Sequence, residues 1–323
     1  MKKLGIIAVV GIFPLAFMIW WYSEAPVRGG IYPEKHKGLE IVVIDEEEVM
    51  VPITLPVRWI KTYPWEKPPI INEISFIDDS DKIFAALGGE YELRIPHSSE
   101  VKWYNRNVGG EVELYLNGAS FAEVGSISTT TIKGSLEKEF ALNQISMTVK
   151  NKKVKFPVDN HYKYRLITKN EKETGWSLEG LMYFFVGDNY DIPEGFVVRL
   201  AGTSGHTLEE IGFWLPGMPD DYYEGEVLYN YQHDFDRYNN AIEEFDGEQL
   251  SLPHEIKNSS LLIYFPFTPS MIEASGDSLA RILPYFHLQN NNGQRYYVGG
   301  SGSIGSLDRR LSWDELIYKR SEH

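Results

Sequence analysis

The stretch Glu111–Val124, EVELYLNGASFAEV, carries the clearest structural signal in this 323-residue chain. Apolar side chains occupy every second position from Val112 to Leu116, which is the period of a strand with one buried face. Asn117-Gly118 follows directly, and this dipeptide is a preferred two-residue turn between antiparallel strands. The stretch therefore predicts a hairpin in which Leu114 lies opposite Phe121.

Similar strand patterns continue on both sides of this stretch. Downstream, Ile145 to Val149 alternates, a turn is predicted across Lys150 to Lys153, and Val154 to Val158 alternates again. Upstream, Val49 to Ile60 has strand character but contains Pro52 and Pro56, which lack the N–H that a ladder needs and therefore predict an edge strand. Together these runs predict an antiparallel β meander.

The second half of the chain indicates further strands and few helices. Leu261 to Phe267 is a continuous apolar run typical of a central strand. Two short helices are expected: Asp79 to Leu87, with acidic capping residues and a Gly88-Gly89 stop, and Ser312 to Tyr318, which opens on a capping-box spacing. The fold class predicted is mainly β, with several antiparallel strands and a few short helices.

The predicted domain organisation has two β-rich lobes. The polar segment Lys169–Gly175 (KNEKETG) is almost free of apolar residues, as boundaries between domains commonly are. We therefore expect one lobe over residues 39–168 and another over residues 175–323, with the short terminal helix in the second lobe. Residues 23–38 are rich in Gly, Pro and charge and predict a linker ahead of the first lobe.

Residues 1–22 predict a signal anchor. Leu4 to Trp21 is an uncharged, mostly apolar run of 18 residues that follows two lysines and ends in an aromatic belt. A helix of that length reaches roughly 27 Å, close to the thickness of a hydrocarbon core. The expected arrangement is an inner-membrane anchor with the remainder in the periplasm. Secretion after cleavage near Ser23-Glu24-Ala25 stays open, although Pro26 makes that site a poor one.

The composition limits the classes of partner. The chain has a formal charge of −15, and removing the +2 of Lys2 and Lys3 leaves −17 for the remainder. Such a charge disfavours nucleic acid and anionic lipid surfaces as partners, and it suits solubility, a cationic protein partner or cation binding. The chain has no cysteine, so it folds without disulfides, which fits a bacterial envelope protein.

No motif predicts a catalytic, cofactor or metal site. Gly300–Gly305 matches a dinucleotide-binding glycine pattern, but the chain after it is too short to complete the βαβ unit, so a glycine-serine loop is preferred. Ser135–Lys138 has the S-x-x-K spacing without its companion motifs. Asp234–Asn239 begins like a calcium loop but lacks the later ligands of an EF-hand, so an EF-hand is excluded and a different calcium site at Asp234 and Asp236 stays open. Asp188–Asp191 raises the same question, and a turn is the default explanation there. A pair of glycosidase carboxylates stays open, because its members need not be close in sequence.

The sequence therefore favours a membrane-anchored, extracytoplasmic binding protein that captures a protein partner, especially a basic one. The concrete version is a bacterial envelope immunity protein that neutralises a toxic effector. A carbohydrate-binding module or hydrolase and a structural component of an envelope assembly are the alternatives. The candidate binding residues lie in one acidic, tyrosine-containing stretch: Asp220, Asp221, Tyr222, Tyr223, Glu224 and Glu226.

Overall fold

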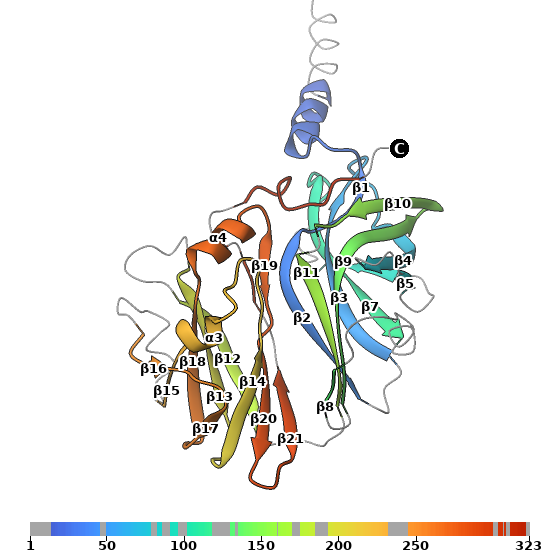
Figure 1. Ribbon diagram of the computed structural model, residues 1–323. Helices are drawn as coiled ribbons and strands as arrows, with labels where there is room; N and C mark the ends of the chain where they lie inside the picture. The colour runs from blue at the N-terminus through green and yellow to red at the C-terminus, as the bar shows by residue number, and fades with distance from the viewer. Residues whose placement is uncertain are drawn as a thin grey trace, which may run out of the picture.

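The protein is a mainly β structure (Figure 1). The computed structural model describes residues 14–45, 50–78, 83–85, 91–95, 102–117, 130–132, 135–159, 161–169, 175–184, 193–231, 245–299, 303–305, 307 and 311–320. Within these ranges the strands form three sheets of thirteen, five and four strands. The predicted mainly β class, with several antiparallel sheets, is confirmed.

The thirteen-stranded sheet contains most of the first half of the chain. Its main path runs β1-β3-β7-β6-β4-β9-β11-β2-β19-β22, with β8 and β10 added to β9 and β5 added to β4. The bounds are β1 (Gly30–Pro33), β2 (His36–Asp45), β3 (Met50–Ile60), β4 (Ile70–Asp78), β5 (Ile83–Ala85), β6 (Tyr91–Arg94), β7 (Asn107–Asn117), β8 (Thr130–Ile132), β9 (Ser135–Val149), β10 (Lys152–Pro157), β11 (Tyr162–Lys169), β19 (Leu279–Ile282) and β22 (Ser303–Gly305).

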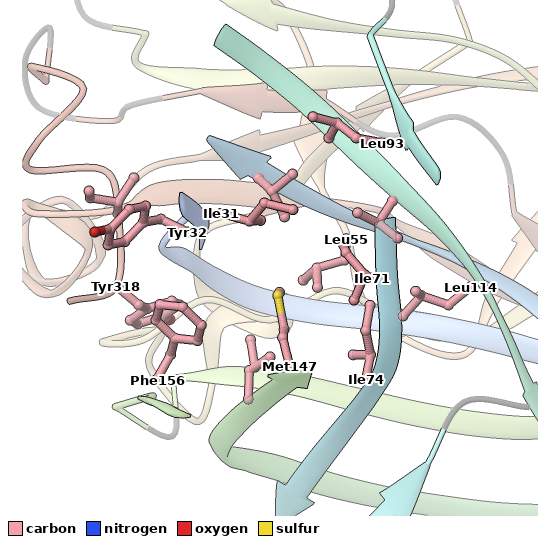
Figure 2. Close-up of a cluster of buried hydrophobic side chains, with 14 of the residues drawn as sticks. Ile31, Tyr32, Leu55, Ile71, Ile74, Leu93, Leu114, Met147, Phe156 and Tyr318 are labelled. Carbon is pink, nitrogen blue, oxygen red and sulfur yellow. The ribbon is translucent and has the colours of Figure 1, made fainter. Parts of the chain in front are cut away.

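The two-residue period of β3 and β7 builds the first hydrophobic core. The antiparallel register places Ile53 opposite Leu114 and Leu55 opposite Val112, and all four side chains are buried. Figure 2 shows Leu55 and Leu114 in this cluster of buried side chains together with Met147 from β9. Because neighbouring strands repeat the same alternation, one face of the sheet is apolar throughout this region.

The predicted turn after β9 is confirmed and is tighter than the four residues proposed. Val149 pairs with Lys152, so Lys150 and Asn151 alone connect β9 to β10. Both residues have positive φ, 51° and 61°, as a type I′ hairpin turn requires. Asn117 is the last described residue of β7, so the predicted Asn117-Gly118 hairpin and the pairing of Leu114 with Phe121 lie outside the described residues.

The predicted edge strand is wrong for β3 as a whole, because β3 lies between β1 and β7. β7 pairs with the whole of β3, whereas β1 pairs with Val57 to Ile60, and the Pro56 carbonyl accepts a hydrogen bond from the Glu34 N–H at 3.0 Å on that side. Pro52 and Pro56 precede the pairing with β1, so their missing N–H groups leave that ladder intact.

The predicted meander is wrong in its connections. β2 pairs in parallel with β11 on one side and in parallel with β19 on the other. β19 comes from the last sixth of the chain, so a strand of the second predicted lobe belongs to the sheet of the first. Parallel neighbours need long crossovers, and the alternation within one strand carries no information about so distant a partner.

The two smaller sheets use the second half of the chain. The five-stranded sheet runs β12 (Ser177–Phe184), β13 (Gly195–Ala201), β18 (Ser260–Pro266), β15 (Leu228–Asn230), β16 (Glu248–Gln249). The four-stranded sheet runs β17 (His254–Ile256), β14 (His206–Gly212), β20 (Tyr285–Asn290), β21 (Arg295–Gly299). β18 lies between β13 and β15 and is buried over six of its seven residues, which confirms the predicted central strand. Apolar side chains of both sheets form a second core.

Two short helices accompany the second core, and neither is one of the two predicted. They are α3 (Tyr222–Gly225) and α4 (Pro269–Ser275). The expected helix at Asp79–Leu87 is overturned where it is described, because Ile83 to Ala85 form β5 on the edge of β4. The remainder of that stretch lies outside the described residues.

The predicted C-terminal helix is a turn. The Glu315 carboxylate forms the expected capping contact by accepting the Ser312 N–H at 2.9 Å, and the Ser312 hydroxyl donates to the same carboxylate at 2.7 Å, but no regular helix follows. Ile317 instead bridges to Glu34, and Ile317 and Tyr318 are buried in the first core rather than in the second lobe. Burial of these two apolar side chains favours extended backbone against β1 over a helical turn.

The N-terminal helix covers residues 14–24 of the described chain, and residues 1–13 lie outside it. No helix among the described residues is long and apolar enough to cross a bilayer. The predicted linker over residues 23–38 is part of the fold: it contains β1 and the start of β2, and Ile31 and Tyr32 are buried in the first core.

Candidate functional site

The acids of the predicted binding stretch are exposed, whereas its tyrosines are structural. Asp220, Asp221, Glu224 and Glu226 are all exposed on or beside α3. Tyr222 is fully buried and donates a hydrogen bond to the Pro266 carbonyl at 2.8 Å.

Tyr223 donates a hydrogen bond to the Phe213 carbonyl and accepts one from its N–H. Both rings of the Tyr222–Tyr223 pair therefore attach α3 to the second core. The assignment of Tyr222 to a partner-binding surface is wrong, because apolar packing and an internal hydrogen bond occupy it.

Strand pairing brings further acids to the same surface. β16 pairs with β15, and the Gln249 amide donates hydrogen bonds to the carbonyls of Glu224 and Gly225 at the end of α3. We define the acidic surface by seven exposed carboxylates: Asp220, Asp221, Glu224, Glu226, Asp246, Glu248 and Glu255. Residues 220–231 and 245–257 contain one basic residue, Lys257, so this surface is strongly negative.

A cluster of aromatic rings lies within the acidic surface. Tyr229 contacts the His254 ring with centroids 4.2 Å apart, and the Tyr231 hydroxyl lies 2.9 Å from His254 Nε2. Burial, followed by the hydrogen bond that Tyr229 donates to Glu248, raises the pKa of Tyr229 to about 12. Burial and the charge of Lys257 lower the pKa of His254. The hydroxyl and the ring are therefore neutral at pH 7, and the carboxylates supply the charge of the surface.

A second surface of opposite charge lies beside the N-terminal helix. The Lys61 N–H donates to the Arg106 carbonyl at 2.9 Å, and Lys150 Nζ lies 2.8 Å from Glu66 Oε1, so three loops are neighbours. We call residues 61–69, 102–106 and 150–155 the helix-side surface. These segments contain eight Lys or Arg residues and one acid, Glu66.

Arg106 fastens the N-terminal helix to this surface. Its guanidinium lies 5.1 Å from the Trp21 ring centroid and 4.2 Å from that of Tyr22. It also donates to the Val27 carbonyl at 2.7 Å, while the Arg106 N–H donates to Glu24 Oε2 at 3.1 Å. These contacts hold the end of the helix against the β domain, and Trp21 is fully buried there.

Among the described residues, the large exposed apolar side chains all lie on the N-terminal helix or close to the helix-side surface. Every large one lies in residues 15–22, in residues 63–70 or at position 103. Trp65 is 77% exposed and Trp103 is 61% exposed, and Trp103 contacts Phe17 of the helix with ring centroids 5.3 Å apart. An exposed group of Trp, Tyr and basic side chains is typical of a surface that meets lipid headgroups or another protein.

A buried group of charged and polar side chains joins the two halves of the chain. Arg281 on β19 donates to Glu40 Oε1 on β2 at 3.1 Å, and the Tyr162 hydroxyl on β11 donates to Glu40 Oε2. His36 lies beside them, and burial followed by the Arg281 charge lowers its pKa to about 3. Since Arg281 and Glu40 are each less than one tenth exposed, this network is a structural connection and not an open active site.

The described residues contain no group of three or more His, Asp or Glu side chains arranged to hold a metal. The two predicted calcium-like stretches, Asp188–Asp191 and Asp234–Asn239, lie outside the described part. Ser303–Gly305 of the glycine motif form β22 against β19, so that part is neither a flexible loop nor the start of a phosphate-binding helix. Ser135–Lys138 lie within β9.

Comparison with known proteins gives no relative by sequence. No family model matches the chain, and no curated protein matches it. Among solved structures, a Porphyromonas gingivalis W83 protein of unknown function is 10% identical, with a TM-score of 0.22, and the alignment covers 84% of this chain and 99% of that one. The partial N-terminal region of an enterococcal surface protein is 8% identical, with a TM-score of 0.26 and coverage of 88% and 97%.

Proposed function

We propose that this protein is held in a membrane through its N-terminal segment and uses its acidic surface, outside the cytoplasm, to bind a basic protein partner. The observation that carries the proposal is the segregation of charge and apolar exposure. Six exposed cations and the exposed aromatic rings lie on the helix-side surface and the N-terminal helix, whereas seven exposed carboxylates cover the region of α3, β15 and β16.

The helix-side surface supports the membrane half of the proposal. Tryptophan and tyrosine are enriched where proteins meet the headgroup layer, and lysine and arginine beside a membrane are attracted to anionic lipids. The chain as a whole carries −15, so the five exposed positive charges that remain on the helix-side surface after Lys150 pairs with Glu66 are opposite in sign to the net charge. Such a reversal next to an apolar N-terminal run favours a bilayer as the neighbour of this end.

The acidic surface supports the binding half. Opposite charge on a partner accelerates association and orients it, and tyrosine rings add contact area at low entropic cost. The concrete form of the proposal remains an envelope immunity protein that covers the cationic site of a toxic effector. In that form the partner contacts Asp220, Asp221, Glu224 and Glu226, together with Asp246, Glu248 and Glu255.

The test uses the full chain in mild detergent as bait for envelope and secreted proteins. We expect it to retain a basic protein whose Kd weakens as salt is raised, because the pairing is electrostatic. The variant Asp220→Asn/Glu224→Gln/Glu226→Gln should weaken that Kd about tenfold, from roughly 0.5 kcal/mol for each charge.

A matched control removes three exposed acids in the region of the first core, as Glu73→Gln/Glu92→Gln/Asp314→Asn, and should leave the Kd within about twofold of the parent. Equal weakening by both variants would show that only net charge matters. Turnover of a glycan or ester without any protein partner would contradict the binding function. Membrane location is tested separately by carbonate extraction, which the full chain should resist.

A further inference from the structure

A cavity of about 290 Å³ lies at the membrane end of the β domain, between β1, the β9–β10 hairpin and the loop over residues 61–69. Its apolar wall includes Met147 and Val149 of β9 and Val154 and Phe156 of β10. The antiparallel register places Met147 opposite Val154, so these side chains share one face of the hairpin. The cavity therefore has an ordered hydrocarbon wall rather than a mobile loop.

The rim of this cavity is cationic. Arg28, Lys150, Lys152 and Arg320 line it, with Glu66 as the one acid among the lining residues described. Lys150 neutralises Glu66 at 2.8 Å, which leaves three positive charges. Arg28 and Lys152 are exposed and have no carboxylate within ion-pair distance among the described residues.

Arg320 is held at the cavity by the segment that leads into β1. Its guanidinium lies 4.6 Å from the Tyr32 ring centroid and donates to the Gly29 carbonyl at 3.4 Å, and its Nε has no hydrogen-bond partner among the described residues. Gly30 has φ of +150°, and a Cβ at that position would overlap the guanidinium. Glycine is thus required for the arginine to lie across the strand beside the cavity.

The cavity continues toward the N-terminal helix. An adjacent depression shares Arg28, Gly29 and Thr62 with it and is lined on its far side by Tyr22 and Ser23. Figure 1 shows the helix on the same side of the molecule as β1 and β10. A molecule entering from the helix end would meet the cationic rim first and the apolar wall next.

We infer that this cavity binds an anionic phospholipid, and the inference rests on the membrane location proposed above. The phosphate lies among Arg28, Lys152 and Arg320, and the first carbons of the glyceryl and acyl groups contact Val149 and Val154. A volume of about 290 Å³ is at the small end for ligand sites, so the cavity takes the headgroup region while the chains stay in the bilayer. A zwitterionic headgroup adds a cation to the same rim and is disfavoured.

The test is native mass spectrometry of the full chain in a nonionic detergent, with phosphatidylglycerol or phosphatidylcholine of equal chain length added. We expect at least fivefold higher occupancy by phosphatidylglycerol. Glycerol 3-phosphate supplied alone should bind at least tenfold more weakly than the lipid, because it lacks the apolar part. Equal retention of the two lipids, or equal binding of glycerol 3-phosphate and phosphatidylglycerol, would overturn the assignment.

Two double variants of equal charge change locate the site. Lys152→Gln combined with Arg28→Gln should lower phosphatidylglycerol occupancy to the level of phosphatidylcholine. Arg94→Gln combined with Lys257→Gln removes two exposed charges that lie outside both the cavity and the helix-side surface, and it should leave occupancy unchanged. A loss of equal size with the second variant would refute the site. Val154→Thr keeps the side-chain shape and should reduce lipid binding without changing the far-ultraviolet circular dichroism.

Lipid binding in detergent is independent of where the protein resides in the cell. A chain that resists carbonate extraction but retains no anionic lipid would refute this inference and leave the membrane location intact. A chain that is freely extracted yet selects phosphatidylglycerol through Arg28 and Lys152 would refute the location and leave the site intact.

Discussion

The helix-side surface and the acidic surface have opposite chemistry on one chain. The first has six exposed cations against Glu66, and the second has seven exposed carboxylates against Lys257. The net charge of −15 has the same sign as the second surface and gives no indication of the first. Composition therefore excludes anionic lipid as a partner only for a protein whose charges are evenly spread, and this protein's charges are not.

The two surfaces also use their aromatic residues differently. Trp65 and Trp103 present their rings to the outside, whereas Tyr222 and Tyr223 point inward and hydrogen-bond to backbone. An exposed indole buries little area on folding, and a group of exposed apolar side chains marks a surface that meets another molecule. A buried tyrosine with a satisfied hydroxyl is part of the core.

Removing the buried ion pair that joins the two halves should have the largest effect. Arg281→Ala leaves Glu40 buried without its cation, which costs about 3–5 kcal/mol of unfolding free energy. Because β19 is a strand of the same sheet as β2, both surfaces should lose their order together. Denaturation by urea measures the change.

The control for this prediction is an ion pair of the same type on the surface. Arg94 pairs with Glu113 at 2.9 Å, but its side chain is 65% exposed. Arg94→Ala should therefore cost no more than about 1 kcal/mol. Equal costs for the two arginines would show that the Arg281–Glu40 pair is not a buried connection.

A fall in pH should lower the free energy of unfolding through a buried histidine, His287 on β20, before it affects either surface. Burial, followed by the charge of Arg295, lowers the pKa of His287 to about 4, so the folded protein leaves this ring neutral where the unfolded chain protonates it. The contribution of the neutral His287 to the free energy of unfolding is therefore fully present above about pH 6.5, and it is lost as the pH falls toward 4. His287→Phe keeps the stacking on Tyr297. Between pH 7 and pH 5 its free energy of unfolding should fall by about 2 kcal/mol less than that of the parent.

Thermal unfolding at both pH values tests this expectation. His36, whose pKa is about 3, stays in the variant and should still cause about 2 kcal/mol of loss over the same interval. An identical pH dependence in parent and variant would contradict the assignment to His287.

The sequence predicted those features that depend on neighbouring residues. The continuous apolar run of β18 identified a central strand, and the alternation around Lys150 identified the β9–β10 turn. The segment before α4 also had a local signal that was overlooked. Thr268 caps the helix by accepting the Met271 N–H, and Pro269 stands at its first position.

Features that depend on distant residues were not predictable in this way. The acids at Asp246 and Glu248 join α3 only because β16 pairs with β15, and nothing in their own stretch indicates that neighbour. Tyr222 occurs among acids in sequence, so its burial under β18 residues could not be inferred locally. Ile83 to Ala85 form a strand because β4 offers an edge, which overrides helix-capping signals upstream.

Loosening the helix should produce a smaller effect that is confined to the helix-side surface. Arg106→Ala removes the stacking on Trp21 and Tyr22 and the hydrogen bond to Val27, at a cost of about 1–2 kcal/mol. Proteolysis between residues 23 and 28 should become faster, while the partner affinity of the acidic surface stays unchanged. Arg106→Lys keeps the charge but loses the planar contact with the rings. Its cleavage rate should lie between those of the parent and Arg106→Ala. An unchanged cleavage rate in Arg106→Ala would contradict this role.

The smallest expected effect is at the β9–β10 turn. Asn151 has φ of 61°, and glycine adopts that region without steric cost. Asn151→Gly should therefore raise the unfolding free energy by about 0.5 kcal/mol without altering the charge of the helix-side surface. A lower urea midpoint would show that the Asn151 side chain has a stabilising contact of its own.

The central claim is that the helix-side surface faces a bilayer and the acidic surface faces away from it. The chain has no cysteine, so single-cysteine variants Lys67→Cys and Glu248→Cys can each carry one fluorophore without further changes. The full chain is placed in vesicles that contain lipids with nitroxide headgroups, and quenching is compared at the two positions. We expect strong quenching at position 67 and none above the aqueous background at position 248. Equal quenching at the two positions, or stronger quenching at position 248, would contradict this orientation.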